Sequence, residues 1–180
     1  MIIIMGLAGA GKGTQAKMLV EKDGYSLIST GDLLRTYATE DQKRRMHEGV
    51  LLEDSEIFAM IREALKTVPD LSKCLIDGTP RSIPQADWLL KQVDAGRFTI
   101  DGVIHLEINE AVVRKRLLAR GRTDDTEDSI TRRFQEYHRA TEPLLDYLSQ
   151  KNIPIYRIQG DQAPDAVHAD IVKSLERSTD

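Results

Sequence analysis

The segment with the clearest chemical role is the glycine-rich run Gly6–Thr14, which reads Gly-Leu-Ala-Gly-Ala-Gly-Lys-Gly-Thr and follows the apolar residues 2–5. Its spacing, a glycine, four residues and then Gly-Lys, is that of a phosphate-binding loop. Glycines let the backbone curl until successive N–H groups converge on one anion. A helix after the loop adds the positive end of its dipole, and Lys12 adds a full charge. The segment therefore predicts a site for nucleotide phosphates rather than a turn that binds nothing.

The residues after Lys12 bear on a metal ion. The usual motif places a Ser or Thr directly after the lysine, where its hydroxyl binds magnesium, but here Gly13 intervenes and Thr14 comes one position later. A direct hydroxyl ligand to the metal is therefore in question. Asp77 ends another apolar run, and a carboxylate there can hold water molecules of a magnesium ion that bridges phosphates. We expect Mg2+ to be held mainly by phosphates and water, with Asp77 reaching it through water.

Arginines stand at three further places along the chain. Arg35 and Arg81 each follow an apolar run, and residues 114–133 hold seven basic and four acidic side chains, a local charge of +3. An anionic partner must be held by local basic sites of this kind, and the planar guanidinium of arginine matches the geometry of phosphate groups. The whole chain carries −4, which leaves −7 outside this segment. That balance disfavours non-specific attraction to nucleic acid or to an anionic membrane.

These groups need a scaffold, and the alternation of short apolar runs with longer amphipathic stretches predicts strand-helix units around a parallel sheet. Most of the runs are apolar on both faces, as buried parallel strands require. We expect five strands, at 2–5, 25–29, 74–77, 103–108 and 153–158, the last at an edge because it contains Pro154. Spacing of three and four residues predicts helices at 13–22, 55–66, 84–94, 110–120 and 164–175, with a long helix from 127 that Pro143 bends or breaks.

Length and composition limit the number of domains and the class of protein. With 180 residues, 41% hydrophobic and 30% charged, the chain fits one α/β domain over 1–180, with the sheet covered by helices on both faces. The single Cys74 cannot form an internal disulfide, and with four scattered histidines it builds no zinc cluster, so we expect a buried thiol. No stretch reaches the roughly 20 apolar residues that span a bilayer, and residues 1–5 lack the basic leader of a signal peptide. We expect a cytoplasmic protein.

Four motifs in order along the chain resemble adenylate kinase, a family of nucleoside monophosphate kinases. The resemblance covers nearly everything from residue 1 to about 160, and its ordered motifs are far more specific together than singly. They are the loop 6–14, Ser-Thr-Gly-Asp-Leu-Leu-Arg at 29–35, Leu-Ile-Asp-Gly-Thr-Pro-Arg-Ser-Ile-Pro-Gln at 75–85, and Arg-Gly-Arg-Thr-Asp-Asp at 120–125. The resemblance implies a P-loop NTPase-type three-layer fold with a five-stranded parallel sheet, an AMP-binding segment at about 30–55 and a short lid at about 120–126.

On the acceptor side, the resemblance implies that Arg35 and Arg81 grip the phosphate of AMP. Gln85 is similar to the side chain that reads the adenine edge, because its amide offers a donor and an acceptor together. Thr30 matches the position at which uridylate and cytidylate kinases typically have alanine, which favours AMP, although a threonine there can also cap the following helix. The full implied AMP site is Thr30, Gly31, Arg35, Gly78, Arg81 and Gln85.

On the donor side, the resemblance implies that Arg116 covers the ATP adenine and that Arg120, Arg122 and Arg133 close over the transferring phosphoryl group. Asp124 and Asp125 could pair with these arginines and orient them, and Arg132 has no counterpart, which leaves it a surface arginine. The implied ATP site is Gly9, Ala10, Gly11, Lys12, Gly13, Thr14, Arg116 and Gly160. The implied catalytic set is Lys12, Arg81, Arg120, Arg122 and Arg133.

The chain departs from the family pattern in five respects. Only Gly121 separates Arg120 from Arg122, so we expect a loop-like lid without the zinc-bearing domain of long-lid relatives. The stretch between residues 35 and 49 is several residues shorter than usual, and residues 49–52 have leucine where the family commonly has Val-Pro. Ala8 replaces a frequent proline and Thr79 a usual aromatic, and neither change removes a phosphate ligand.

The expected activity is Mg-dependent, reversible transfer of the γ-phosphoryl group of ATP to AMP, giving two ADP, with no zinc and no covalent intermediate. The nearest alternative is a UMP or CMP kinase, and one of another class is a nucleotide-binding regulator without catalysis. A regulator would need no second set of phosphate-binding residues. The presence of Arg35, Arg81 and Gln85 therefore counts against this alternative. The expected partners are the nucleotides ATP, AMP and ADP, and the resemblance implies a monomer.

Overall fold

The computed structural model describes residues 1–47, 52–120 and 125–177, without the side chains of residues 45–47. Within these residues the chain forms a five-stranded, wholly parallel sheet in the order β2-β3-β1-β4-β5. The strands are β1 (Ile2–Gly6), β2 (Ser26–Ser29), β3 (Cys74–Asp77), β4 (Gly102–Glu107) and β5 (Ile155–Gln159). The five predicted strands and the edge position of the last are confirmed, with ends that differ by at most two residues.

The centre of the sheet is the part that is apolar on both faces. Ile3 lies opposite Ile76 on one side and Val103 on the other, and all three are fully buried. Strands that are buried on both sides must be apolar throughout, which explains why these runs show no alternation of polar and apolar residues. Cys74 lies at the start of β3 as the buried free thiol that the sequence predicts, and burial raises its pKa to about 11.

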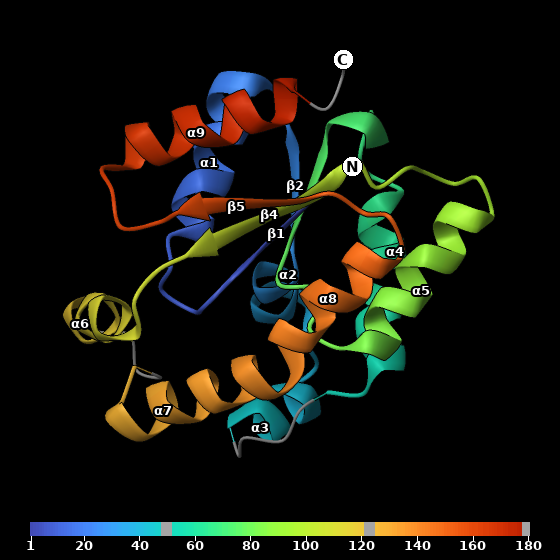
Figure 1. Ribbon diagram of the computed structural model, residues 1–180. Coiled ribbons are helices and arrows are strands. Elements are labelled where there is room, and N and C mark those ends of the chain that lie inside the picture. The colour runs from blue at the N-terminus through green and yellow to red at the C-terminus, as the bar shows by residue number, and fades with distance from the viewer. Residues whose placement is uncertain (48–51, 121–124, 178–180) are drawn as a thin grey trace.

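Helices cover both faces of the sheet, as Figure 1 shows. One core cluster joins the sheet to α1, α6, α7 and α9, and a second joins the opposite face to α5 and α8, with α2 and α4 at its border. The helices are α1 (Lys12–Asp23), α2 (Thr30–Tyr37), α3 (Glu40–His47), α4 (Asp54–Leu65), α5 (Ile83–Asp94), α6 (Glu110–Arg120), α7 (Glu127–Glu136), α8 (Glu142–Gln150) and α9 (Pro164–Glu176). The three-layer α/β architecture of a P-loop NTPase fold is confirmed.

The long helix predicted from residue 127 is divided, but the change begins before Pro143. A π-helical turn, Tyr137–Thr141, joins α7 to α8, and Pro143 lies in the first turn of α8. Proline lacks an N–H, and its ring crowds the carbonyl four residues earlier, so the hydrogen-bond pattern must change over the preceding turn. The sequence also did not resolve α3, whose residues carry too little apolar periodicity to mark a helix.

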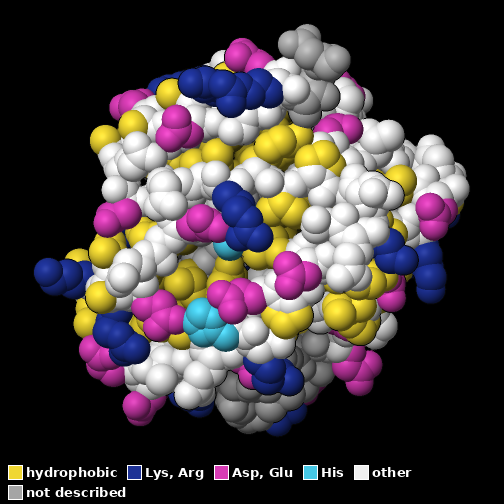
Figure 2. Space-filling view, viewed as in Figure 1, with side chains coloured by type: hydrophobic (Ala, Val, Ile, Leu, Met, Phe, Trp, Pro, Cys, Tyr) yellow, Lys and Arg dark blue, Asp and Glu magenta, His cyan; other side chains and the backbone are white. Residues whose placement is uncertain are grey.

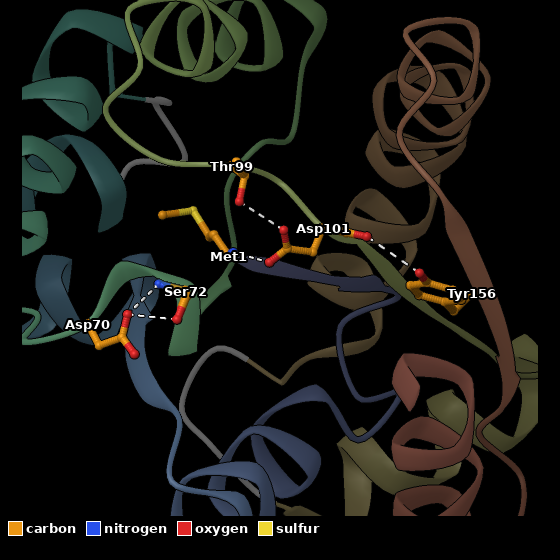
Figure 3. A network of polar contacts seen from close by, with 6 residues as sticks. All are labelled: Met1, Asp70, Ser72, Thr99, Asp101 and Tyr156. Carbon is orange, nitrogen blue, oxygen red and sulfur yellow. Dashed lines mark hydrogen bonds and ion pairs between the residues drawn. The ribbon is translucent and has the colours of Figure 1, made fainter. Parts of the chain in front are cut away.

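Polar contacts fix the amino ends of the strands, at the edge opposite the phosphate loop. The buried Met1 ammonium lies 2.5 Å from Asp101 Oδ2, and Thr99 Oγ1 donates to Asp101 Oδ1 at 2.9 Å, as Figure 3 shows. Nearby, the Asp70 carboxylate accepts from the backbone and hydroxyl of Ser72, just before β3 begins. These contacts lie at the amino ends of the strands, so the carboxyl ends remain available for a site. No helix in the described ranges is long and apolar enough to cross a membrane.

Candidate active site

Each predicted site residue that the structure describes lies at the carboxyl end of a strand or in a segment that follows one. The loop after β1 leads into α1, β2 leads directly into α2, β3 ends at Asp77, β4 leads to α6, and β5 ends just before Gly160. In an open parallel sheet the carboxyl ends meet at one edge, where ligands bind. Residues that are far apart in sequence are therefore brought to one edge of the sheet (Figure 1).

The phosphate loop has the backbone that its glycines permit. Gly9 and Gly11 adopt φ angles of 91° and 102°, in the region that L side chains rarely enter. A Cβ on Gly9 would lie 2.8 Å from Leu117 Cγ, so the loop packs directly on α6 there. In contrast, a Cβ on Gly13 would meet nothing within 4 Å, and Thr14 is exposed. The loop is therefore tight against the core behind Gly9 and open at its helical end.

The Lys12 side chain bends back over this loop. Its Nζ donates to the carbonyl oxygens of Gly6 at 2.7 Å and Leu7 at 2.9 Å. Burial lowers the pKa of Lys12 to about 8, an effect that Asp77 opposes and the positive charges of Arg81 and Arg120 reinforce. Because this ammonium is poorly hydrated and contacts only two carbonyl oxygens, a bound phosphate would strongly stabilise its charged form.

Asp77 and the arginines around it share this electrostatic environment. Burial raises the pKa of Asp77, whereas the charges of Lys12, Arg81 and Arg35 lower it. The pKa of Arg81 is lowered by loss of hydration and by repulsion from Arg133, although its side chain still reaches solvent. Cations from the ends of β1, β2 and β3 and from α6 and α7 therefore act on one small region, which is the arrangement that polyphosphate binding requires.

On the acceptor side, β2 and β3 place the predicted residues in contact. Thr30 and Thr79 are both buried, and their hydroxyls lie 2.8 Å apart. Arg81 Nε donates to the Gly78 carbonyl at 2.8 Å, and a Cβ on Gly78 would lie 3.4 Å from both Arg81 Nη2 and Thr30 Cβ. The glycine thus allows the loop after β3 to approach β2 closely.

Arg35 and Gln85 complete that side with charge and an amide. The Arg35 guanidinium is exposed, pairs with Asp32 Oδ1 at 2.5 Å, and lies within 3.4 Å of a Cβ built on Gly31. Gln85 Oε1 accepts from the Arg81 backbone N–H at 2.8 Å, and its Nε2 donates to Asp54 Oδ1 at 2.7 Å. Both side chains therefore have defined positions without any ligand bond.

A buried carboxylate organises the arginines at the other side. Asp125, whose side chain is 0% exposed, accepts from Arg120 Nε at 2.8 Å and Nη2 at 2.7 Å, and from Arg133 Nη1 at 3.2 Å. The predicted pairing of Asp125 with these arginines is present, in a two-bond arrangement that fixes the plane of the Arg120 guanidinium. Arg122 and Asp124 lie outside the described residues. Arg132 is exposed, as expected for a surface arginine.

Two predicted ATP-side residues meet across 44 positions of sequence. Arg116 Nη1 donates to the Gly160 carbonyl at 3.2 Å, and Nη2 lies 3.3 Å from Asp161 Oδ1. Gly160 is buried, and a Cβ there would lie 3.3 Å from the carbonyl oxygens of Ala10 and Glu107. The loop after β5 therefore packs against the phosphate loop and holds the Arg116 guanidinium beside it.

Four further residues at this edge make contacts that the sequence did not predict. They are Asp32, Asp54, Thr79 and Asp161, which contact Arg35, Gln85, Thr30 and Arg116 respectively. Each is a common surface or turn residue type, so only the fold reveals its partner. Within the described ranges no three His, Cys, Asp or Glu side chains form a group that could hold a metal ion.

A separate hollow of about 640 Å3 lies between the ends of β4 and β5 and helices α6 and α8. His138 lines it and is held between Glu110 at 2.5 Å and Glu142 at 2.9 Å, contacts that raise its pKa. Acidic and basic side chains are interspersed on the face that Figure 2 shows, so that face has no large patch of a single charge. Among the residues that the structure describes, none of the predicted nucleotide ligands lines the hollow.

Comparison with known proteins agrees with this geometry. Residues 4–153 match the family described as "Adenylate kinase". The adenylate kinase of Parasynechococcus marenigrum (strain WH8102) is 39% identical over 158 residues, which cover 84% of this chain and 86% of that protein. The adenylate kinases of Corynebacterium glutamicum (strain R) and Phocaeicola vulgatus (strain ATCC 8482) are 35% and 36% identical, each over at least 97% of this chain and 98% of the relative. With its phosphate loop and two sets of arginines at one sheet edge, this chain belongs to the adenylate kinase family.

Proposed function

We propose that the protein catalyses reversible, Mg-dependent transfer of the γ-phosphoryl group of ATP to AMP, giving two ADP. The observation that carries the proposal is the convergence of cations from separate strand ends: the charges of Arg81 and Arg120 both act on Lys12 at the phosphate loop. A protein that only bound ATP would not need Arg81, which comes from the loop after β3 and lies beside Thr30 and Gly78 on the acceptor side. Two polyanions can therefore meet at one cationic region.

In the proposed donor site, the loop residues Gly9–Thr14 hold the phosphates of ATP through backbone N–H groups. Lys12 exchanges its bonds to the Gly6 and Leu7 carbonyls for bonds to phosphate oxygens. Arg116, held by Gly160, covers the adenine. Arg120 and Arg133, oriented by Asp125, and Arg122 neutralise charge that develops on the transferring group.

In the proposed acceptor site, Arg35 and Arg81 bind the AMP phosphate, while Thr30, Gly31 and Gly78 form the surface beside its base. The AMP phosphate oxygen is already an anionic nucleophile, so no general base and no covalent intermediate are needed. Catalysis then consists of positioning and charge stabilisation. Magnesium, when bound through phosphates and water, supplies further charge neutralisation, and Asp77 fits a role in holding its water.

The proposal assigns the domain organisation as well. One domain spans 1–180, with an AMP-binding segment at about 30–55 and a short lid at about 120–126. The position of Arg120 at the end of α6 and of Asp125 just before α7 supports the lid assignment, because it places the ends of the proposed lid on two packed helices. We further propose a cytoplasmic monomer that acts on free nucleotides.

A parallel phosphoryl-transfer assay tests the substrate assignment. Purified protein with ATP and Mg2+ is given AMP, CMP, UMP or dAMP, and ADP formation is followed by chromatography. The expected result is rapid turnover with AMP. Turnover with CMP or UMP but not AMP would instead identify a pyrimidine nucleotide kinase, and no turnover with any monophosphate would favour a nucleotide-binding regulator.

A substitution in the acceptor site tests the assignment of Arg81. Arg81→Ala removes a guanidinium that we place on the AMP phosphate, and we expect kcat/KM for AMP to fall by at least about a hundredfold. Arg132→Ala is the matched control, because it removes the same charge from an exposed surface position on α7. Near-normal turnover of Arg81→Ala would show that the acceptor phosphate binds elsewhere.

A further inference from the structure

The amide of Gln85 is held at both of its ends. Its Oε1 accepts from the Arg81 backbone N–H at 2.8 Å, and its Nε2 donates to Asp54 Oδ1 at 2.7 Å. A backbone N–H can only donate and a carboxylate can only accept. Turning the amide by 180° would therefore place its NH2 group against an N–H and its oxygen against a carboxylate. The two contacts together leave one allowed orientation.

This orientation leaves two hydrogen-bonding positions unused. An amide oxygen has two lone pairs and an amide nitrogen has two hydrogens, and Arg81 and Asp54 occupy one of each. Gln85 therefore still offers one acceptor and one donor side by side, in a fixed order. A base that binds there must present a donor opposite the oxygen and an acceptor opposite the nitrogen.

The bases differ in that order. Adenine presents an amino group and an unprotonated ring nitrogen, whereas hypoxanthine, guanine and uracil present a carbonyl oxygen and a protonated ring nitrogen. The second pattern would require the turned amide. We propose that Asp54 is a positioning residue that selects 6-amino purines over 6-oxo purines by fixing the Gln85 amide, an inference that rests on the proposed function of the acceptor site.

The position of Asp54 is itself well defined. It is the first residue of α4, and Gln85 lies in the first turn of α5. One turn further along, the Phe58 and Trp88 rings stack with centroids 4.7 Å apart and planes 3° from parallel, which fixes the separation of the two helices. Both partners of the hydrogen bond are thus carried on packed helices rather than on a free loop.

The test compares AMP with IMP, which differ at the 6 position. Asp54→Asn keeps the shape of the side chain but lets it donate as well as accept. In the turned orientation of Gln85, the contact between the amide oxygen and residue 54 is then no longer unfavourable. We expect the ratio of kcat/KM for AMP to that for IMP to fall about tenfold, mainly through KM for AMP, while KM for ATP stays unchanged. The Arg81 N–H still opposes the turned amide, so some preference for AMP remains.

Controls separate this effect from a structural one. Glu63→Gln removes the same charge from an exposed position on α4 and should leave the ratio unchanged. The ratio of two acceptors does not depend on the fraction of folded enzyme, and Asp54→Ala, measured in parallel, should lower it as well. A ratio within about twofold of wild type in both Asp54 variants, or equal losses with AMP and IMP, would overturn the inference. Failure of the proposed function is distinct, because the wild-type protein would then not phosphorylate AMP at all.

Discussion

Proton uptake on ATP binding follows from the state of Lys12 in the free protein. Burial lowers its pKa to about 8, and its ammonium is held by only two carbonyl oxygens. A bound triphosphate adds negative charge beside the ammonium and favours its protonated form, so the pKa must rise on binding. Above pH 8 the binding of ATP should therefore be coupled to protonation of Lys12.

The size of the effect follows from the pKa. At pH 8.5 a group with a pKa of about 8 is roughly three-quarters neutral, so ATP binding should take up about 0.7 proton, against about 0.1 at pH 7. ATP affinity should accordingly weaken by up to about tenfold per pH unit between pH 8 and the raised pKa of the complex. Stability of the free protein has the opposite slope. The unfolded chain binds more protons than the folded one between pH 8 and 10.5, so this group makes the folded state more stable as pH rises through that window.

Isothermal titration calorimetry in two buffers of different ionisation enthalpy measures this uptake at pH 7 and 8.5. Lys12→Met should abolish the pH-dependent uptake together with most of the ATP affinity. Lys17→Met is the matched control, since Lys17 is an exposed lysine of the same helix. Equal proton uptake at both pH values in the wild-type protein would refute the reasoning, because Lys12 would then be fully charged before ATP arrives.

Three further predictions concern the same edge of the sheet and its surroundings. Asp125→Asn weakens the ion pair with Arg120, so both the free energy of unfolding, measured by urea titration, and kcat should fall. We expect a loss of about 2–4 kcal/mol, which is smaller than the loss on breaking a fully buried ion pair because the Arg120 guanidinium is partly exposed. Unchanged stability and kcat would contradict the orienting role of this carboxylate. Gly9→Ala should cost about 2–4 kcal/mol, because its φ is 91° and its Cβ would clash with α6, whereas Gly13→Ala should change stability by less than about 1 kcal/mol; equal costs would be inconsistent with the described loop. Two glutamates raise the pKa of His138 in the folded protein, so its stabilising effect is present below about pH 6.5 and is lost as pH rises. The difference in free energy of unfolding between wild type and His138→Gln should therefore shrink from pH 6 to pH 8. A difference that grows over this range would contradict the raised pKa.

The sheet was predictable because burial on both faces imposes continuous apolar runs. The continuous apolar runs at residues 2–5, 74–77 and 103–108 predicted buried strands, and Pro154 indicated an edge strand. The order of strands in the sheet does not follow from these runs, because it depends on how the crossover helices pack. The π turn between α7 and α8 was also not predictable in detail, since proline shows that a helix must change but not where the change begins.

The site was predictable in its charged residues and much less so in their supports. Lys12 and the arginines follow strand ends in recognisable motifs, and Asp125 lies within one of them. Asp54 lies 31 residues before Gln85, and nothing near it in sequence marks the contact. Such partners are set by the packing of α4 on α5, so they emerge only when the tertiary structure is known.

The most direct test of the central claim is the stoichiometry of products when the purified protein is incubated with ATP, AMP and Mg2+. Phosphorus NMR follows all nucleotide and phosphate signals in one sample. Transfer from ATP to AMP predicts two ADP for each AMP consumed, no inorganic phosphate, and the reverse reaction when ADP alone is supplied. Formation of ADP and inorganic phosphate in equal amounts, with AMP unchanged, would contradict the account, because water rather than a second nucleotide would then be the acceptor.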